Sequence, residues 1–198
     1  MRTERIIIAA AVFAVGVFIA VLPSCKDAQA GDVTGYTPPM STHADTVKRG
    51  EYLVTVLGCN DCHSAKKFGP AGPVIDSATM LGGFIASNGV PKASKVNGPW
   101  MLFAPDLTAA VGSWGMSFAA NISSDDTGIG TWSEEQFFRV LREGKYKGLS
   151  NSRNLLPPMP WQGYKKLPDD EIRAIFAYLK STKPVKNIVP APIAPDKL

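Results

Sequence analysis

The sequence contains few residues of the kinds that usually hold metals, with three cysteines and two histidines among 198 residues. A zinc site built on Cys59 and Cys62 would require a second pair of ligands, and the one remaining cysteine is Cys25, near the start of the chain. The sequence also shows no internal repeat, no phosphate-binding loop and no nucleic-acid-binding motif. These absences disfavour structural zinc domains, nucleotide-binding proteins and nucleic-acid-binding proteins.

Two of the three cysteines lie in the run Cys59-Asn60-Asp61-Cys62-His63. In a C-x-x-C-H run the two thiols can add to the vinyl groups of haem, and the histidine can then ligate the iron. The alternative is a redox dithiol, but a thioredoxin-type dithiol is followed by a helix, whereas proline and glycine follow here. The run therefore predicts one covalently attached haem c, held by Cys59 and Cys62, with His63 as the proximal iron ligand.

The segment after His63 is expected to be a loop, because residues 68–73 contain two prolines and two glycines. We expect the backbone carbonyl of Pro70 or Pro73 to accept the Nδ1 proton of His63, which leaves Nε2 for the iron. Residues 74–120 carry aromatic side chains but little periodicity. They are interpreted as a long irregular insertion that covers part of the haem edge, with a partly flexible surface loop as the alternative.

The first 25 residues are typical of an export leader, with two arginines before the uncharged stretch Ile6–Leu22. Three outcomes remain open. The run Leu22–Cys25 resembles a lipobox, which would make Cys25 a lipidated N-terminus; Ala28–Ala30 offers ordinary signal cleavage; or the stretch stays as a membrane anchor. All three place the domain on the periplasmic side of a bacterial membrane, and the odd cysteine favours lipidation because a free thiol is a liability there.

Composition divides the rest into a tether over 26–44, a domain over 45–186 and a proline-containing tail over 187–198. Apolar residues at helical spacing predict a first helix that ends at Gly58. A capping-box pattern at Ser133–Gln136 predicts a second helix that ends at Gly144. A third is predicted to start after the run Pro168–Glu171 and to stop at Pro184. Gly50 lies inside the first helix, which indicates that another element crosses closely there.

Together these features resemble class I cytochrome c domains, and in particular the haem modules of bacterial dehydrogenase cytochrome c subunits. Besides the haem motif, the likeness rests on the run Asn121–Trp132, the helix end Arg142–Gly144, a Pro-Met-Pro turn and a terminal helix containing Ala177–Leu179. The resemblance covers about residues 45–186. It implies a mainly α, class I cytochrome c-like helical fold around one covalent haem, interrupted by the irregular insertion, and a crossing of the first and last helices.

The resemblance also implies Met159 as the distal iron ligand. Met159 alone among the methionines is bracketed by prolines, at 157, 158 and 160, which restrict the backbone and favour one orientation of the side chain. His43, the other histidine, would have to serve a bis-histidine site, but its place in the tether favours a solvated side chain. The competing methionines, each more often a core filler than a ligand, are Met40, Met80, Met101 and Met116.

These expectations indicate electron transfer rather than catalysis. The predicted function is that of an exported monohaem c-type cytochrome, which carries single electrons between membrane-associated or periplasmic redox partners. A cytochrome c subunit of a dehydrogenase or oxidase complex is the alternative. A peroxidase or gas-binding site would need an open iron position, which a methionine ligand argues against.

Charge is distributed unevenly along the chain, whose formal net charge is +4. From Arg139 to the end there are twelve Lys and Arg residues but five Asp and Glu residues. Such a run is most often a solvated face, but here it predicts a docking surface for an acidic redox partner. The basic residues that flank the Met159 turn are Lys145, Lys147, Lys165 and Lys166.

Overall fold

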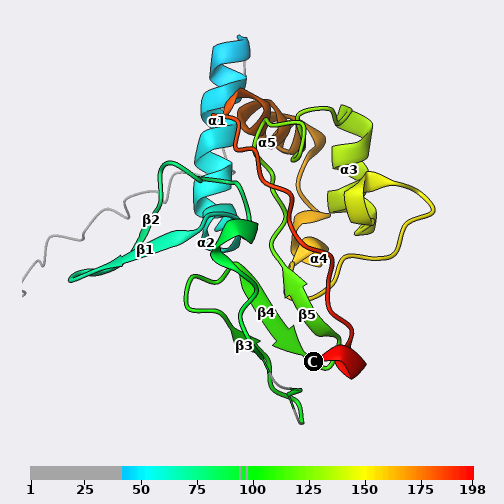
Figure 1. Ribbon diagram of the computed structural model, residues 1–198. Helices are drawn as coiled ribbons and strands as arrows, with labels where there is room; N and C mark the ends of the chain where they lie inside the picture. The colour runs from blue at the N-terminus through cyan, green and yellow to red at the C-terminus, as the bar shows by residue number, and fades with distance from the viewer. Residues whose placement is uncertain (1–41, 94, 97) are drawn as a thin grey trace, which may run out of the picture. The chain divides into compact units, whose positions relative to one another are not determined.

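The computed structural model of the chain describes residues 42–93, 95–96 and 98–198. The predicted leader, Cys25, Met40 and most of the tether lie outside the described residues. Figure 1 shows the helices α1, α3 and α5 together on one side and the strands on the other. The α helices are α1 (His43–Val56), α2 (Cys59–His63), α3 (Glu134–Glu143), α4 (Trp161–Tyr164) and α5 (Asp169–Ser181), and the short 3-10 turns are η1 (Ala86–Asn88), η2 (Tyr146–Gly148) and η3 (Pro195–Lys197).

The first helix begins earlier than the sequence suggested. Thr42 forms its N-cap, and the Thr42 side chain accepts a hydrogen bond from the backbone N–H of Asp45. His43 is therefore the first residue of α1 rather than part of the tether, although its side chain is exposed as expected. The helix ends before Gly58, which adopts a left-handed φ of 70° and allows the chain to turn directly into α2.

The predicted crossing of the first and last helices is confirmed by the packing at Gly50. A Cβ atom added to Gly50 would lie 1.9 Å from the carbonyl oxygen of Ala174 and 2.7 Å from the Cβ of Tyr178, both on α5. The two backbones approach this closely only because residue 50 has no side chain. Close to this crossing, Arg49 forms an ion pair with the buried Glu171 at 2.8 Å.

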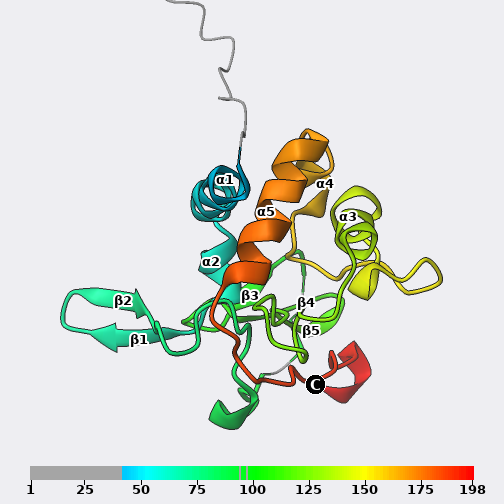
Figure 2. The same cartoon turned by 90° about the horizontal axis from the view of Figure 1, so that it is seen from above.

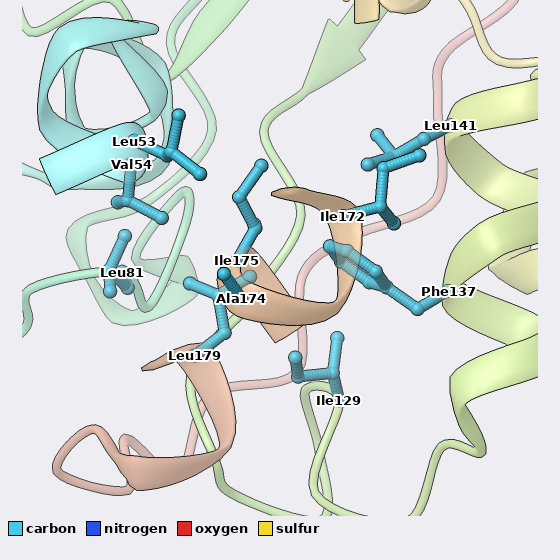
Figure 3. Packing of buried hydrophobic residues seen from close by; sticks show 10 residues of the cluster. All are labelled: Leu53, Val54, Leu81, Ile129, Phe137, Leu141, Ile172, Ala174, Ile175 and Leu179. Atoms are coloured by element: carbon cyan, nitrogen blue, oxygen red, sulfur yellow. The ribbon is translucent and has the colours of Figure 1, made fainter. Parts of the chain in front are cut away.

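The apolar core joins α1, α3 and α5 (Figure 3). Helix α3 has the predicted capping box, in which Ser133 and Gln136 exchange side-chain and backbone hydrogen bonds, and it ends at Gly144. Two loop residues, Leu81 and Ile129, complete the core from outside the helices. The buried cluster contains Leu53, Val54, Leu81, Ile129, Phe137, Leu141, Ile172, Ala174, Ile175 and Leu179.

The segment predicted to be irregular contains most of the sheet structure, so that part of the fold prediction is wrong. A hairpin of β1 (Lys66–Gly69) and β2 (Gly72–Ile75) projects away from the helices in both views (Figures 1 and 2). A second, three-stranded antiparallel sheet has the order β3–β4–β5. The strands of this sheet are β3 (Leu102–Phe103), β4 (Ala109–Gly112) and β5 (Gly115–Phe118). The fold therefore contains sheet as well as α-helix.

The C-terminal tail lies against the edge of the second sheet. Ile193 forms an isolated antiparallel bridge with Met116 of β5. A Cβ atom at Gly115 would lie 2.0 Å from the carbonyl oxygen of Ile193, so the close approach of the tail requires glycine at this position. None of the described helices combines the length and the apolar character that crossing a membrane would require.

Candidate covalent haem site

The C-x-x-C-H run forms the short helix α2, which begins directly after Gly58. Cys59 and Cys62 are half-buried free thiols on this helix. Burial raises the pKa of the Cys59 thiol to about 11 and also raises the pKa of Cys62. Both sulfur atoms therefore remain protonated near neutral pH, and the two side chains stand within one turn of the same helix.

His63 is oriented by a hydrogen bond from its Nδ1 atom to the carbonyl oxygen of Ala120, at 2.8 Å. Because a carbonyl can only accept, Nδ1 must carry the proton, which leaves the lone pair of Nε2 available to a metal. Burial lowers the pKa of His63, which favours the neutral imidazole.

The prediction that Pro70 or Pro73 would accept the Nδ1 proton is wrong. These residues belong to the β1–β2 hairpin, which extends away from the helices, and both are exposed. The physical reason is that Lys66–Ile75 pairs with itself as a hairpin, so the chain leaves the motif instead of folding back over it. The accepting carbonyl comes instead from the residue two positions after β5, for which sequence periodicity gave no signal.

Several hydrogen bonds fix the backbone just after the motif. The Ser64 hydroxyl donates to Oδ1 of Asn60 and accepts from the backbone N–H of Leu81, each at 2.8 Å. The N–H of Gly83 donates to the carbonyl oxygen of His63 at 2.8 Å. The motif is thus anchored on the segment 81–83, which also contributes the buried Leu81 to the core.

Lys66 is a further residue that the sequence did not single out. Its ammonium group donates to three backbone carbonyl oxygens, those of Asp61, Ser64 and Asp106. The first two belong to the haem-motif turn and its exit, and the third belongs to the loop before β4. Lys66 therefore ties the C-x-x-C-H turn to the three-stranded sheet.

Tyr164 connects the same turn to the chain around Met159. Its hydroxyl donates to the carbonyl oxygen of Leu57 at 2.9 Å, two residues before Cys59. Burial raises the pKa of Tyr164 to about 12, so the hydroxyl keeps the proton that this bond needs. Tyr164 is the last residue of α4, the helix that begins two residues after Met159.

Met159 is half-buried and packs against the same apolar core as Cys59. The turn that carries it is held by β5, because the Ser117 hydroxyl donates to the carbonyl oxygen of Pro157 at 2.6 Å. Among the competing methionines, Met116 is buried on β5, Met80 packs on the core and Met101 is 41% exposed. The assignment of Met159 as the distal ligand stays a prediction.

The donor set fits a covalently attached haem better than a protein-held metal ion. Two thiols and an adjacent neutral imidazole with a free Nε2 are the groups that haem c requires. Among residues 42–93, 95–96 and 98–198, no group of three or more His, Cys, Asp or Glu side chains could hold a metal ion.

Comparison with known proteins identifies the relatives of the chain, although no family model matches it. It is 26% identical over 149 residues to the fructose dehydrogenase cytochrome subunit of Gluconobacter japonicus, covering 74% of the chain and 24% of the relative. It is 30% identical over 133 residues to the gluconate 2-dehydrogenase cytochrome c subunit of Pantoea cypripedii, covering 67% and 22%. It is 28% identical over 141 residues to the cytochrome c subunit of a quinone alcohol dehydrogenase of Gluconobacter oxydans, covering 70% and 22%.

The chain spans about a quarter of the length of these curated relatives. The matched part covers most of the chain in each case, so the similarity is not confined to the five residues of the haem motif. The chain is thus a homologue of the cytochrome c subunits of bacterial dehydrogenases and resembles one of their haem modules.

Proposed function

We propose that this chain is an exported monohaem c-type cytochrome that carries single electrons between membrane-associated or periplasmic redox partners. The observation that carries the proposal is the C-x-x-C-H helix, in which the Ala120 carbonyl fixes the His63 tautomer. A redox dithiol or a structural turn would gain nothing from an imidazole held with Nε2 free. An iron ligand requires that arrangement.

In this proposal each named side chain has one task. Cys59 and Cys62 would form the thioether bonds to the haem, and His63 and Met159 would ligate its iron. When bound, the haem supplies one-electron redox chemistry. The protein would supply an apolar surrounding, two fixed iron ligands and the exclusion of water, and we expect no catalytic activity of its own.

A second candidate function is that of a permanent cytochrome c subunit of a dehydrogenase or oxidase complex. The relatives favour it, because their names describe cytochrome subunits of fructose, gluconate and alcohol dehydrogenases. The chain has a single C-x-x-C-H run, and so carries one haem in this proposal. Membrane attachment through Cys25 and a basic docking face complete the proposal.

A reduced-minus-oxidised spectrum of the exported protein, combined with a pyridine haemochrome assay, tests the proposal. We expect the spectrum of haem c, one haem per chain, and retention of the haem on a denaturing gel. The double substitution Cys59→Ser with Cys62→Ser should abolish retention. Exported, folded wild-type protein that lacks covalent haem would overturn the proposal.

The two candidate functions differ in the size of the native particle. A free carrier should elute with its haem absorbance at the volume of a single chain with its bound detergent and without dehydrogenase activity, whereas a permanent subunit should co-elute with a dehydrogenase activity. Size-exclusion chromatography of detergent extracts from the native host, followed at the haem absorption, separates these outcomes.

A further inference from the structure

A hollow with a volume of about 620 Å³ lies on the three-stranded sheet. Its floor is made of small or buried apolar side chains of β4 and β5, namely Ala109, Ala110, Val111 and Met116, each at most 7% exposed. The volume lies within the range of roughly 300–1,000 Å³ that is usual for small-molecule sites.

The walls of this hollow are apolar side chains that the fold leaves in contact with solvent. Trp100 is 71% exposed, Leu102 is 57% exposed and Phe103 is 42% exposed. Burying such side chains is favourable, so a ligand that covered them would gain binding free energy. Leu102 and Phe103 form the edge strand β3, which pairs on one side only, with β4.

The charge around the hollow has one sign. Lys92 and Lys95 belong to its lining, and the sequence contains no Asp or Glu from residue 77 to residue 105. The next carboxylate, Asp106, is outside the lining and accepts hydrogen bonds from the N–H and hydroxyl of Thr108. Within the described part of the chain, neither lysine forms an ion pair.

Among the described residues, the lining of the hollow shares no residue and no hydrogen bond with Cys59–His63. The bonds that hold that turn come from Ala120, Gly83 and Lys66. The lining of the hollow matches a molecule with an apolar body and one anionic end, because the lysines can meet the anion while the floor and walls cover the apolar body.

We infer that this hollow binds one molecule of a long-chain carboxylate, with the alkyl chain over Ala110 and Met116 and the carboxylate near Lys92 and Lys95. A fatty acid anion has both required parts. A neutral apolar molecule would leave the two ammonium groups without a partner, and a short carboxylate would leave the apolar floor uncovered.

The test is calorimetric titration of the haem-loaded protein with dodecanoate, kept below its micelle concentration. Saturable binding at one molecule per chain is expected, with no measurable binding of butyrate and at least about tenfold weaker binding of dodecanol, which lacks the charge. The double substitution Lys92→Glu with Lys95→Glu should weaken dodecanoate at least about tenfold, because like charges then meet. The matched control, Lys183→Glu with Lys197→Glu, makes the same change in net charge on exposed lysines outside the lining and should leave binding unchanged.

A second pair of variants tests the apolar contribution. Trp100→Ser with Leu102→Ser should abolish saturable binding, while Ile188→Ser, at a side chain that is 76% exposed and outside the lining, should not. All these positions are exposed, so folding is retained, and circular dichroism checks it. Equal weakening by the lysine pair and its control would overturn the inference, and so would binding of dodecanol as tight as that of dodecanoate.

Two other occupants give distinct results. Sedimentation with phosphatidylglycerol vesicles, without binding of monomeric dodecanoate, would assign this face to a membrane surface and overturn the inference. A dimer in sedimentation velocity that Trp100→Ser dissociates, again without dodecanoate binding, would assign the face to a second copy of the chain and would also overturn it.

Discussion

The imidazole of His63 depends on a carbonyl group that lies 57 residues further along the chain, at Ala120. The last residue of the insertion, Ala120, determines which nitrogen of His63 carries the proton, and the prediction that the insertion covers the haem edge stays a prediction. The same segment also holds the Met159 turn, through the bond from Ser117 to the Pro157 carbonyl. Both proposed iron ligands are therefore oriented by residues between β5 and α3 or on β5 itself.

The substitution Met159→Ala tests the distal ligand. A thioether is a soft, neutral ligand that favours ferrous iron, so its loss should lower the reduction potential. The near-infrared band of the sulfur–iron bond should disappear, and added imidazole or carbon monoxide should bind more readily. The haem should stay attached, because Cys59, Cys62 and His63 are unchanged.

The other methionines provide matched controls for this prediction. Met80→Ala removes a side chain that is also partly buried against the core, and it should leave the near-infrared band in place. If Met159→Ala retains the band while Met101→Ala or Met116→Ala loses it, the distal ligand comes from the insertion and the assignment of Met159 is wrong.

Tyr164→Phe tests the connection between α4 and the haem-motif turn. The substitution removes only the hydroxyl that donates to Leu57 and leaves that carbonyl without its partner, so it should lower the free energy of unfolding by about 1–2 kcal/mol. Denaturant unfolding followed by circular dichroism measures the change. Tyr52→Phe is the matched control, because the Tyr52 side chain is 55% exposed and should contribute little. Equal free energies of unfolding for the two variants would mean that the hydrogen bond from Tyr164 to Leu57 does not stabilise the fold.

At the scale of whole elements, the sequence predicted the helices because their apolar residues recur at helical spacing and their ends carry glycine, serine or proline signals. The strands β4 and β5 lacked the corresponding signal. In β4, Ala109–Gly112 are small or apolar and all buried, so no alternation of apolar and polar residues marks the strand. In β5, Met116 and Phe118 alternate with Gly115 and Ser117, but over four residues only, which is too short to predict a strand. The cysteines and His63 could be predicted from spacing alone, whereas Ala120, Lys66 and Tyr164 act through long-range contacts that no local pattern reveals.

Gly50→Ala tests the crossing of α1 and α5. The new methyl group would lie 1.9 Å from the Ala174 carbonyl oxygen, so the helices must separate, and overpacking of this kind lowers stability by about 1–3 kcal/mol or more. The control is Gly163→Ala in α4, where an added Cβ meets nothing within 4 Å. Chemical denaturation should show a large decrease in the free energy of unfolding for Gly50→Ala and almost none for Gly163→Ala. A Gly50→Ala protein as stable as wild type would contradict the packing.

At the scale of the whole molecule, attachment to the membrane is proposed to depend on Cys25, outside the described residues. If Cys25 is lipidated, mass spectrometry of the mature protein should show a diacylglyceryl group on an N-terminal Cys25. Cys25→Ala should alter processing and release the protein from the membrane fraction, because a lipoprotein carries more than one acyl chain and is therefore held firmly in the membrane. A mature N-terminus at Gly31 without lipid would contradict lipidation and support ordinary signal cleavage.

The four lysines of the predicted docking face differ in their surroundings. Lys147, Lys165 and Lys166 are exposed, whereas Lys145 is half-buried and donates to Oδ1 of Asn154 at 3.2 Å. The exposed three lie on η2 and just after α4, on either side of the Met159 turn in sequence. Lys147 lies over the Tyr146 ring and Lys165 over the Trp161 ring, but all three charges face solvent and can attract an approaching partner. Lys145 has a hydrogen bond that a charge reversal would break.

Reversal of Lys147, Lys165 and Lys166 to Glu therefore tests electrostatic steering without disturbing Lys145. The second-order rate of electron exchange with an acidic partner should fall at low ionic strength, and the difference from wild type should shrink as salt screens the charges. Reversal of Lys48, Lys183 and Lys197, which are also exposed, makes the same change in net charge away from the Met159 turn in sequence and should slow the reaction much less. Stopped-flow kinetics over a range of salt concentrations measures both variants. Equal effects of the two sets would mean that net charge alone sets the rate. Unchanged rates at low salt would mean that these lysines are an ordinary solvated surface, because long-range attraction between charges in water depends on ionic strength.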